Sequence, residues 1–396
     1  MGTVITFSVN EPLKNRRRWV VYPKEINEEF DCSFATELKS IEEVIAESTF
    51  RHAVTLDVSS CFHHFLVSER VAPYFCFEYN QEYYQITTVP TGGRDPPAIA
   101  QLVTSALLLG TTSVSTTHID NIRLGCDVRD VLDNDTKVVL QNARSFGIAI
   151  EVCSTADEYD FLGVTFSHAV GHGKNTAVQI ASKTRKKVEA SQLSDEITLR
   201  QVVGIFSRLV YCSAILKLPI HPYYLVYKFL RRRIGRNLDE LADVWSCVKP
   251  ILARWRITVL QAPKRFVLNS TLHEAATVLV TDASLSGWGA VAYCKSGVVT
   301  VAGPWNNAER ALHINLLEFK ALLNAITSMR AVLGDSLDIL IDNTSVMHCI
   351  HRRRSNSFEL NNMVGHLSSL ISVNSVNYIQ SAENEADPFS RLFGPN

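Results

Sequence analysis

The sequence predicts a multidomain protein of the α+β class, and two observations support this prediction. The chain has 396 residues, which is long enough for two or three separate cores. The order of strand-like and helix-like segments also changes along the chain. Strands and helices alternate up to about residue 170, residues 183–260 are helical, and a further strand-and-helix unit spans residues 277–391. Alternation of this kind is typical of α/β or α+β units.

Hairpins and strands dominate the first unit. Residues 51–57 are expected to form a strand that ends on an acid. Residues 74–78 and 83–89 alternate aromatic and β-branched side chains, as the two strands of a hairpin do. Residues 98–109 are compatible with a helix, and residues 113–122 predict a second hairpin with an acid at its tip.

The second unit is a run of helices and the third returns to a mixed pattern. Thr198 and Gln201 resemble a capping box at the start of a helix whose apolar stripe is typical of core packing. Residues 262–269 are expected to be a linker. The third unit then has three strands, a long helix over residues 309–333, a strand, two helices, a strand and a final helix over residues 384–392.

Composition and cysteine spacing favour an intracellular globular protein. The chain is 46% hydrophobic and 20% charged, and we find no apolar run of about eighteen residues that would predict a membrane span. Residues 1–30 lack the apolar stretch of a secretory signal. The nine cysteines stand singly, without a CxxC pair, which favours free thiols in a reducing compartment over zinc or redox sites. We therefore expect the protein in the cytoplasm or nucleus, not secreted.

Basic residues are clustered although the net charge is only −1. A nucleic-acid backbone requires local positive patches and not a basic whole, so several clusters in different segments favour an extended track for a polyanion. Any single cluster is better explained as a solvated helix face. The clusters are Arg16–Arg18, Arg185–Lys187, Arg231–Arg233 with Arg236, and Arg352–Arg354.

Four acidic residues of the third unit stand in positions that suit a metal site. Asp282 and Asp342 each follow an apolar strand, so neighbouring strand ends could place their carboxylates side by side. Glu318 lies in the middle of an apolar helix, where a carboxylate is costly unless a cation accompanies it. Asp387 lies near the start of the last helix. Each acid alone is equally explained as a surface carboxylate or a helix cap.

The segments around these acids resemble a known family. TDASLSGWGAV, INLLEFKALLNAI, LIDNTSV and NEADPFSR resemble the four acidic blocks of the RNase H domain in retroelement polyproteins, most of all those of the DIRS-like and VIPER-like (tyrosine-recombinase) group. The resemblance implies that Asp282, Glu318, Asp342 and Asp387 are catalytic metal ligands for two Mg²⁺ or Mn²⁺ ions. The histidine that many such enzymes carry before the last acid is missing from residues 372–386.

Two further segments resemble the palm of a reverse transcriptase. VTLDVSSCFHHF resembles the first palm motif, which makes Asp57 a catalytic ligand for two metals and Phe62 the steric gate that selects deoxynucleotides. Phe62 is equally compatible with a core aromatic. THIDNIRLG resembles the central palm hairpin, which makes Asp120 a catalytic metal ligand. Asn121 replaces the second aspartate, so it keeps an oxygen for hydrogen bonding to the substrate but lacks the charge.

The remaining motifs concern the incoming nucleotide. RRRWVVYPKEIN resembles the fingers segment that clamps a triphosphate, with Arg18 on the phosphates and Asn27 closing the motif. VPTGGRDPPAIAQ resembles the loop and helix that touch nucleotide and template through Gly92 and Gln101. On composition alone these segments are a basic arm and an ordinary Pro-Gly turn. The lysine expected in a later palm motif is absent, and Glu151-Val152-Cys153 stands there.

The resemblance also implies a domain order. Residues 1–50 would be partial fingers, residues 51–182 the palm, residues 183–270 a helical thumb or connection, and residues 271–396 an RNase H-like α/β domain with a mixed five-stranded sheet. Such a protein would bind an RNA template, a DNA primer, RNA–DNA hybrid and deoxynucleoside triphosphates, and no membrane. Asn121 and the missing lysine favour an alternative, a polymerase-inactive region that binds nucleic acid beside an active RNase H. A third interpretation of the sequence is a non-catalytic scaffold derived from a retroelement.

Overall fold

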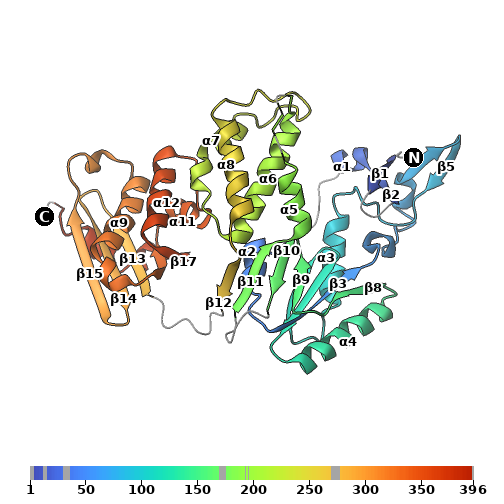
Figure 1. Ribbon diagram of the computed structural model, residues 1–396, viewed down its shortest axis with the longest axis horizontal. Helices are drawn as coiled ribbons and strands as arrows, with labels where there is room; N and C mark the ends of the chain where they lie inside the picture. The colour runs from blue at the N-terminus through green and yellow to red at the C-terminus, as the bar shows by residue number, and fades with distance from the viewer. Residues whose placement is uncertain are drawn as a thin grey trace. The chain divides into compact units, whose positions relative to one another are not determined.

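Two compact units make up the chain in the computed structural model (Figure 1). The structure describes residues 4–11, 16–29, 36–168, 175–191, 193–194, 196–268 and 277–394. Unit 1 comprises Met1–Ala181 with Lys264–Leu268, and unit 2 comprises Ser182–Pro263 with Asn269–Asn396. The predicted α+β multidomain fold is confirmed, while the finer division into four domains stays a prediction.

A four-stranded antiparallel sheet forms the core of unit 1, with the order β6-β7-β3-β8. The helices α3 and α4 pack against it, and Val54, Leu56, Ile122 and Leu124 point into the shared core. Apolar residues alternate along β3 and β7, which explains why one side of each strand is buried beneath the helices. The bounds are β3 (His52–Val58), β6 (Val114–His118), β7 (Asn121–Cys126), β8 (Ile150–Ser154), α3 (Pro96–Ala106) and α4 (Arg129–Ser145).

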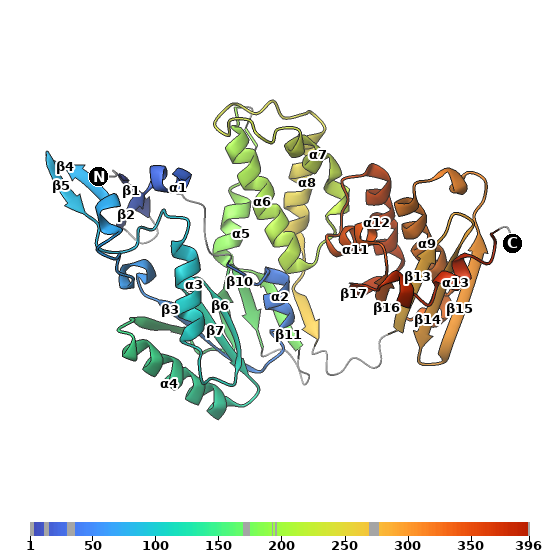
Figure 2. The same ribbon diagram turned by 180° about the vertical axis from the view of Figure 1, so that it is seen from behind.

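A second four-stranded sheet of unit 1 has the order β12-β11-β10-β9. Residues 262–269 were expected to be a linker, but this prediction is wrong for residues 265–268. These residues form β12, which pairs with β11 and completes the sheet of unit 1 (Figure 2). The open edge of β11 offers hydrogen-bonding groups that this short run can satisfy. The strands are β9 (Glu158–Phe161), β10 (Val164–Ser167), β11 (Asn175–Ile180) and β12 (Arg265–Leu268).

A buried arginine packs against both sheets of unit 1. Arg123 is 1% exposed and lies 5.0 Å from the ring centre of Phe166 and 5.3 Å from that of Phe161. Its guanidinium donates hydrogen bonds to Ser48 Oγ and to the carbonyl oxygen of Val44. These contacts satisfy a charged group that would otherwise destabilise the interior. Arg123 therefore ties β7 to the second sheet and to α2 (Ile41–Ala46).

Two small hairpins and a short helix complete unit 1. The predicted hairpin forms from β4 (Cys76–Tyr79) and β5 (Glu82–Gln85), with Asn80 and Gln81 at positive φ in the turn. The second strand is shorter than expected, because the backbone N–H groups of Ile86 and Val89 bond to Phe75 and Phe65 instead. The other elements are β1 (Ile5–Glu11), β2 (Arg16–Tyr22) and α1 (Lys24–Glu29).

The helical part of unit 2 contains α5 (Ser182–Glu189), α6 (Leu199–Leu216), α7 (Tyr224–Arg231) and α8 (Val248–Gln261). The capping box predicted for Thr198 and Gln201 is present at the start of α6. By length and composition alone α6 could cross a membrane, but 44% of it is buried inside the structure. Core helices of soluble proteins pass the same test, so this is weak evidence for a membrane span.

The predicted mixed five-stranded sheet is the second part of unit 2, with the order β15-β14-β13-β16-β17. The first three strands are antiparallel, whereas β13, β16 and β17 are parallel. The helices α9, α11 and α12 share one core with the sheet, and Ala386 and Phe389 pack in a separate cluster with Val280 and Val291. The strands are β13 (Thr277–Ala283), β14 (Gly287–Cys294), β15 (Gly297–Pro304), β16 (Ser336–Ile341) and β17 (Ser372–Tyr378).

The helices of this part are shorter than the sequence predicts. The long helix expected over residues 309–333 is divided, because Leu312 and His313 are extended and His313 caps a new helix start. The last helix is restricted to Asp387–Ser390, where Pro388 suits a first turn but could not lie inside a longer helix. The bounds are α9 (Ile314–Ser328), α10 (Arg330–Leu333), α11 (Thr344–His351), α12 (Phe358–Leu370) and α13 (Asp387–Ser390).

Candidate active sites

Three of the four predicted acids of unit 2 meet at the end of the five-stranded sheet. The strands β13 and β16 pair in parallel with Thr281 opposite Ile341, so the acids that follow these two residues emerge from adjacent strand ends. Carboxylate oxygens of Asp282, Glu318 and Asp342 all lie within 4.8 Å of one another. Within the described residues, this is the one group of three or more such donors that comes so close.

Burial makes the carboxyl groups of this acidic centre costly to ionise in the absence of a cation. Asp282 is 4% exposed and Glu318 is 8% exposed. Burial, followed by the nearby carboxylates of Asp282 and Asp342, raises the pKa of Glu318 to about 9, although a hydrogen bond from the backbone of Ala283 opposes this rise. Burial likewise raises the pKa of Asp282, although a hydrogen bond from the side chain of Ser390 lowers it in part.

The donor set of the acidic centre fits a hard divalent cation. Glu318 Oε2 is buried and has no hydrogen-bond partner among the described residues, so a lone pair inside the protein is left unsatisfied. Carboxylate oxygens are the ligands that Mg²⁺ prefers. A bound cation would satisfy this oxygen and relieve the repulsion among the three carboxylates.

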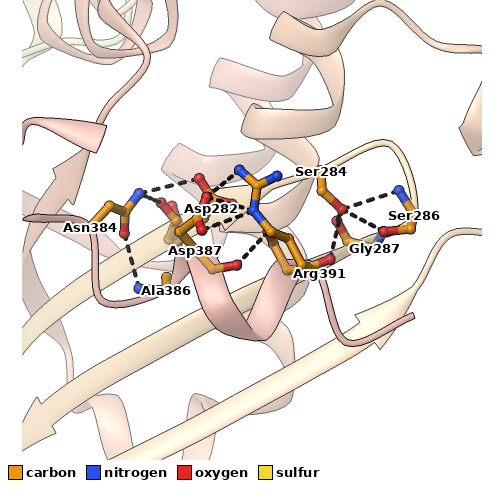
Figure 3. Close-up of polar contacts among 10 residues, drawn as sticks. Asp282, Ser284, Ser286, Gly287, Asn384, Ala386, Asp387 and Arg391 are labelled. Carbon is orange, nitrogen blue, oxygen red and sulfur yellow. Dashed lines mark hydrogen bonds and ion pairs between the residues drawn. The ribbon is translucent and has the colours of Figure 1, made fainter. Parts of the chain in front are cut away.

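The fourth predicted ligand, Asp387, lies outside this group of three. It forms the first residue of α13, and both of its carboxylate oxygens accept hydrogen bonds from Arg391, at 2.9 Å and 3.0 Å from Nε (Figure 3). The Arg391 guanidinium therefore lowers the pKa of Asp387. The expectation that all four acids form one cluster is met for three of them, while Asp387 is paired with an arginine.

Asn384 is a residue of the acidic centre that the sequence did not reveal. It is 4% exposed, and its Nδ2 lies 3.3 Å from Asp282 Oδ1 and 3.2 Å from the carbonyl oxygen of Thr281. Figure 3 shows Asn384 beside Asp282. Its Oδ1 accepts a hydrogen bond from the backbone N–H of Ala386. Asn384 thus fixes the segment that leads to Asp387. Its place in NEADPFSR, three residues before an acid, was the available signal.

The predicted palm residues Asp57 and Asp120 lie on neighbouring strands of unit 1. Asp57 near the end of β3 is paired with Asn121, and the backbone N–H of Val58 donates to the carbonyl oxygen of Asp120 at 2.8 Å. Asp120 occupies the tip of the predicted β6–β7 hairpin, next to Ile119 at positive φ. The two acids therefore belong to one site.

Asn121 and Glu151 give this palm site an unusual charge pattern. Asn121 Nδ2 donates a hydrogen bond of 2.7 Å to Asp120 Oδ1, so the amide orients the carboxylate that a second aspartate would repel. Glu151 stands on β8 opposite Asp57, in the segment where the resemblance expects a lysine. Burial and the two aspartates raise the pKa of the Cys61 thiol to about 12, so this thiol stays protonated.

Gln101 on α3 bonds to the hairpin that carries Asp120. Its Oε1 accepts from the backbone N–H of Ile119 at 2.7 Å, and its Nε2 donates to Thr117 Oγ1 at 2.7 Å. Thr104, one turn later, donates to the carbonyl oxygen of Ile119. The amide expected to touch substrate thus positions the hairpin tip in this structure.

Gly92 lies against the backbone of β2. A Cβ at this position would lie 2.5 Å from the carbonyl oxygen of Val21, so the expected close backbone approach is present. Asn27 holds the same loop, because its amide donates to the carbonyl oxygen of Gly92 and accepts from the N–H of Arg94.

Two other predicted substrate contacts stay predictions. Phe62 lies in the 3₁₀ turn Cys61–His64 and is partly buried against the core of the first sheet. This position is compatible both with a steric gate and with a core aromatic. Arg18 lies on β2 opposite Val9, but its side chain is outside the described residues.

Comparison with known proteins identifies part of unit 1. Residues 18–166 match the family model "Reverse transcriptase (RNA-dependent DNA polymerase)". This segment is therefore similar to reverse transcriptase domains. The match contains Asp57, Asp120, Gly92 and Gln101, so the palm residues predicted from the sequence fall inside it. No curated protein matches the chain.

Solved structures with the same fold include three of the foamy viral protease-reverse transcriptase. The first, of a form titled dRH in complex with double-stranded DNA, has a TM-score of 0.58 at 14% identity. The second, with RNA/DNA hybrid, and the third, with double-stranded DNA, have TM-scores of 0.55 and 0.53 at 15% identity. Each covers 96% of this chain, which itself covers 65%, 50% and 78% of theirs. The chain therefore spans less than two thirds of the first two proteins.

Proposed function

We propose that this chain is the reverse transcriptase and RNase H part of a retroelement polyprotein, within the DIRS-like or VIPER-like group. The similarity of residues 18–166 to reverse transcriptases supports polymerisation. The observation that carries the nuclease half is the meeting of Asp282, Glu318 and Asp342 within 4.8 Å at two parallel strand ends. Free thiols at the described cysteines agree with the proposed cytoplasmic or nuclear location.

The proposed substrates follow from both sites together. The palm would extend a DNA primer on an RNA template with deoxynucleoside triphosphates, and the acidic centre would cut the RNA of the resulting RNA–DNA hybrid. Foamy viral reverse transcriptase structures with double-stranded DNA and with RNA/DNA hybrid support nucleic acid as the partner. The proposed cofactors are two Mg²⁺ or Mn²⁺ ions at each site.

In the nuclease half, Asp282, Glu318 and Asp342 would hold the metal, and Asp387 would join them when it leaves Arg391. Bound metal ions would supply charge stabilisation for the attacking and leaving oxygens of the phosphodiester. Asn384 keeps Asp282 and the segment before Asp387 in place. In the palm, Asp57 and Asp120 would hold the metal while Asn121 and Gln101 fix the carboxylate and the hairpin that carries it.

Cleavage of a labelled RNA–DNA hybrid tests the nuclease half. Asp342→Asn removes one charged ligand, so cleavage should fall by at least about 100-fold. The exposed Glu383, which lies near the last helix but outside the acidic centre, provides the matched control Glu383→Gln. Equal cleavage by the wild type and Asp342→Asn would remove the nuclease assignment.

Primer extension with Mg²⁺ and with Mn²⁺ tests the polymerase half. Asp57→Ala should abolish extension, while Asp130→Ala on the exposed start of α4 should not. The neutral Asn121 and the acidic Glu151 favour a second candidate function, a polymerase-inactive region that binds nucleic acid beside an active RNase H. Hybrid cleavage without any extension under either metal would select this alternative, and loss of both activities would leave only the non-catalytic scaffold.

A further inference from the structure

A cavity of about 410 Å³ lies in unit 2, away from the acidic centre. Three segments build it: the first turns of α6, the end of α7 with the turn that follows, and the turn between α11 and α12. Two basic clusters that are far apart in the sequence therefore meet at one place. The lining includes Leu199, Tyr227, Arg231, Arg233, Arg236 and Arg354.

The charge of this cavity is of one sign. Four arginines line it and no aspartate or glutamate does. The guanidinium of Arg233 donates a hydrogen bond to the carbonyl oxygen of Asp243 and lies 3.7 Å from the centre of the Phe229 ring. The guanidinium groups of Arg231, Arg236 and Arg354 make no hydrogen bond or ion pair with another described residue. Guanidinium groups in this state are suited to phosphate, which they bind through two parallel hydrogen bonds.

The walls of the cavity are apolar and contain one unsatisfied polar atom. Leu199, Val203, Phe206 and Leu230 contribute hydrocarbon surface, and Arg354 lies 4.2 Å from the centre of the Tyr227 ring. The Tyr227 hydroxyl is buried without a hydrogen-bond partner among the described residues. A ligand with a flat apolar body and a polar edge would cover these walls and satisfy the hydroxyl.

We propose that this cavity binds one unpaired nucleotide of a single-stranded nucleic acid, with its base against the apolar wall and its phosphates on Arg231, Arg236 and Arg354. The volume lies within the range of small-ligand sites, about 300–1,000 Å³, and cannot admit a duplex. The strand is preferred over a free nucleotide because Arg231 and Arg236 are exposed at the rim, where the phosphates of neighbouring nucleotides would lie. The site is separate from both proposed active sites and would remain if either were inactive.

Binding of a fluorescein-labelled oligothymidylate to the full chain, followed by fluorescence anisotropy, tests the proposal. The variant Arg231→Gln/Arg354→Gln should weaken binding by about 10-fold and reduce the salt dependence of the affinity. Arg310→Gln is the matched control, since Arg310 is exposed in the same unit but does not line the cavity. It should change binding by less than about 2-fold. Circular dichroism would establish that the variants fold.

A second measurement locates the bound nucleotide. An oligonucleotide with 4-thiothymidine, irradiated on the protein, should cross-link to residues 227–238 or 354–356, and Tyr227→Phe should weaken binding by about 3-fold. Three results would overturn the proposal: equal losses for the double variant and Arg310→Gln, an equal loss for a duplex hairpin, or cross-links confined to other segments. Thymidine monophosphate that binds the same residues as tightly as the strand would instead identify a free-nucleotide site.

Discussion

The two acidic sites of this protein place carboxylates in different surroundings. In unit 2, three carboxylates are brought together with little solvent, and burial raises the pKa of Glu318 to about 9. In unit 1, Asp120 stands at a half-buried hairpin tip and receives a hydrogen bond from a neutral amide, Asn121. The carboxyl groups of the first site are costly to ionise without a cation, whereas Asp120 in the second already has a hydrogen-bond donor beside it. Metal should therefore contribute to folding stability in unit 2 and mainly to catalysis in unit 1.

The largest expected effect concerns Glu318. Without a cation, Glu318 must take up a proton on folding at pH 7, because its pKa is raised to about 9. Glu318→Gln removes this cost, so it should raise the stability of the metal-free protein while hybrid cleavage falls by at least about 100-fold. Thermal unfolding in EDTA, with and without Mg²⁺, measures the first effect. Glu383→Gln should change neither quantity. Lower stability of Glu318→Gln in EDTA would contradict the inference that the buried carboxyl group of Glu318 destabilises the metal-free protein.

Acid should destabilise unit 1 through His168. Burial and the nearby Arg123 lower the pKa of this histidine to about 4, with Asp157 opposing and His52 adding to the effect. The unfolded chain then binds more protons than the folded one between pH 6.5 and 4, so stability is lost as pH falls through that window, by about 1–3 kcal/mol. Urea unfolding at pH 7 and pH 4.5 measures the loss. His168→Phe should reduce it, and an unchanged pH dependence would contradict this account.

Gln101 should matter for polymerisation without touching substrate. Gln101→Ala removes two hydrogen bonds that hold the hairpin tip, so extension should slow by about 10-fold at saturating nucleotide. A positioning role predicts a lower kcat with little change in KM for the nucleotide, whereas a direct contact predicts a higher KM. Gln141→Ala on the exposed face of α4 is the control.

The smallest expected effect tests whether Arg391 competes with a metal ion for Asp387. Arg391 competes with a cation for both oxygens of Asp387, so Arg391→Gln should tighten Mn²⁺ binding by about 3-fold in calorimetry. Arg310→Gln should leave the affinity unchanged. Weaker Mn²⁺ binding in Arg391→Gln would mean that the arginine orients Asp387 for the metal and does not compete with it.

Local patterns predicted much of the fold and of the acidic centre. An acid that follows an apolar run marks a strand end, and parallel pairing of β13 and β16 then brings Asp282 and Asp342 together. The hairpin tip with Asp120 was predictable for a similar reason, because alternation and a polar tip are local signals. The mixed five-stranded sheet and the capping box of Thr198 were also predicted correctly.

Features that depend on distant packing could not be predicted in this way. Nothing near Gln101 indicates that its amide faces Ile119, and nothing near Arg354 indicates that it meets Arg231 across a cavity. The ion pair between Asp387 and Arg391 could have been predicted from the sequence, because the two residues stand four positions apart in a helical segment. Its effect on the acidic centre depends on where α13 packs, which the sequence does not display.

The strand β12 has a consequence for the synthesis of the chain. Its partner β11 is complete long before residues 265–268 leave the ribosome, because α5, α6, α7 and α8 are made in between. During that interval β11 presents an unpaired edge, which is a template for association with other chains. The helices α5, α6, α7 and α8 therefore lie in a loop closed by two paired strands, and the edge of β11 stays open to other chains at least until these helices have been synthesised.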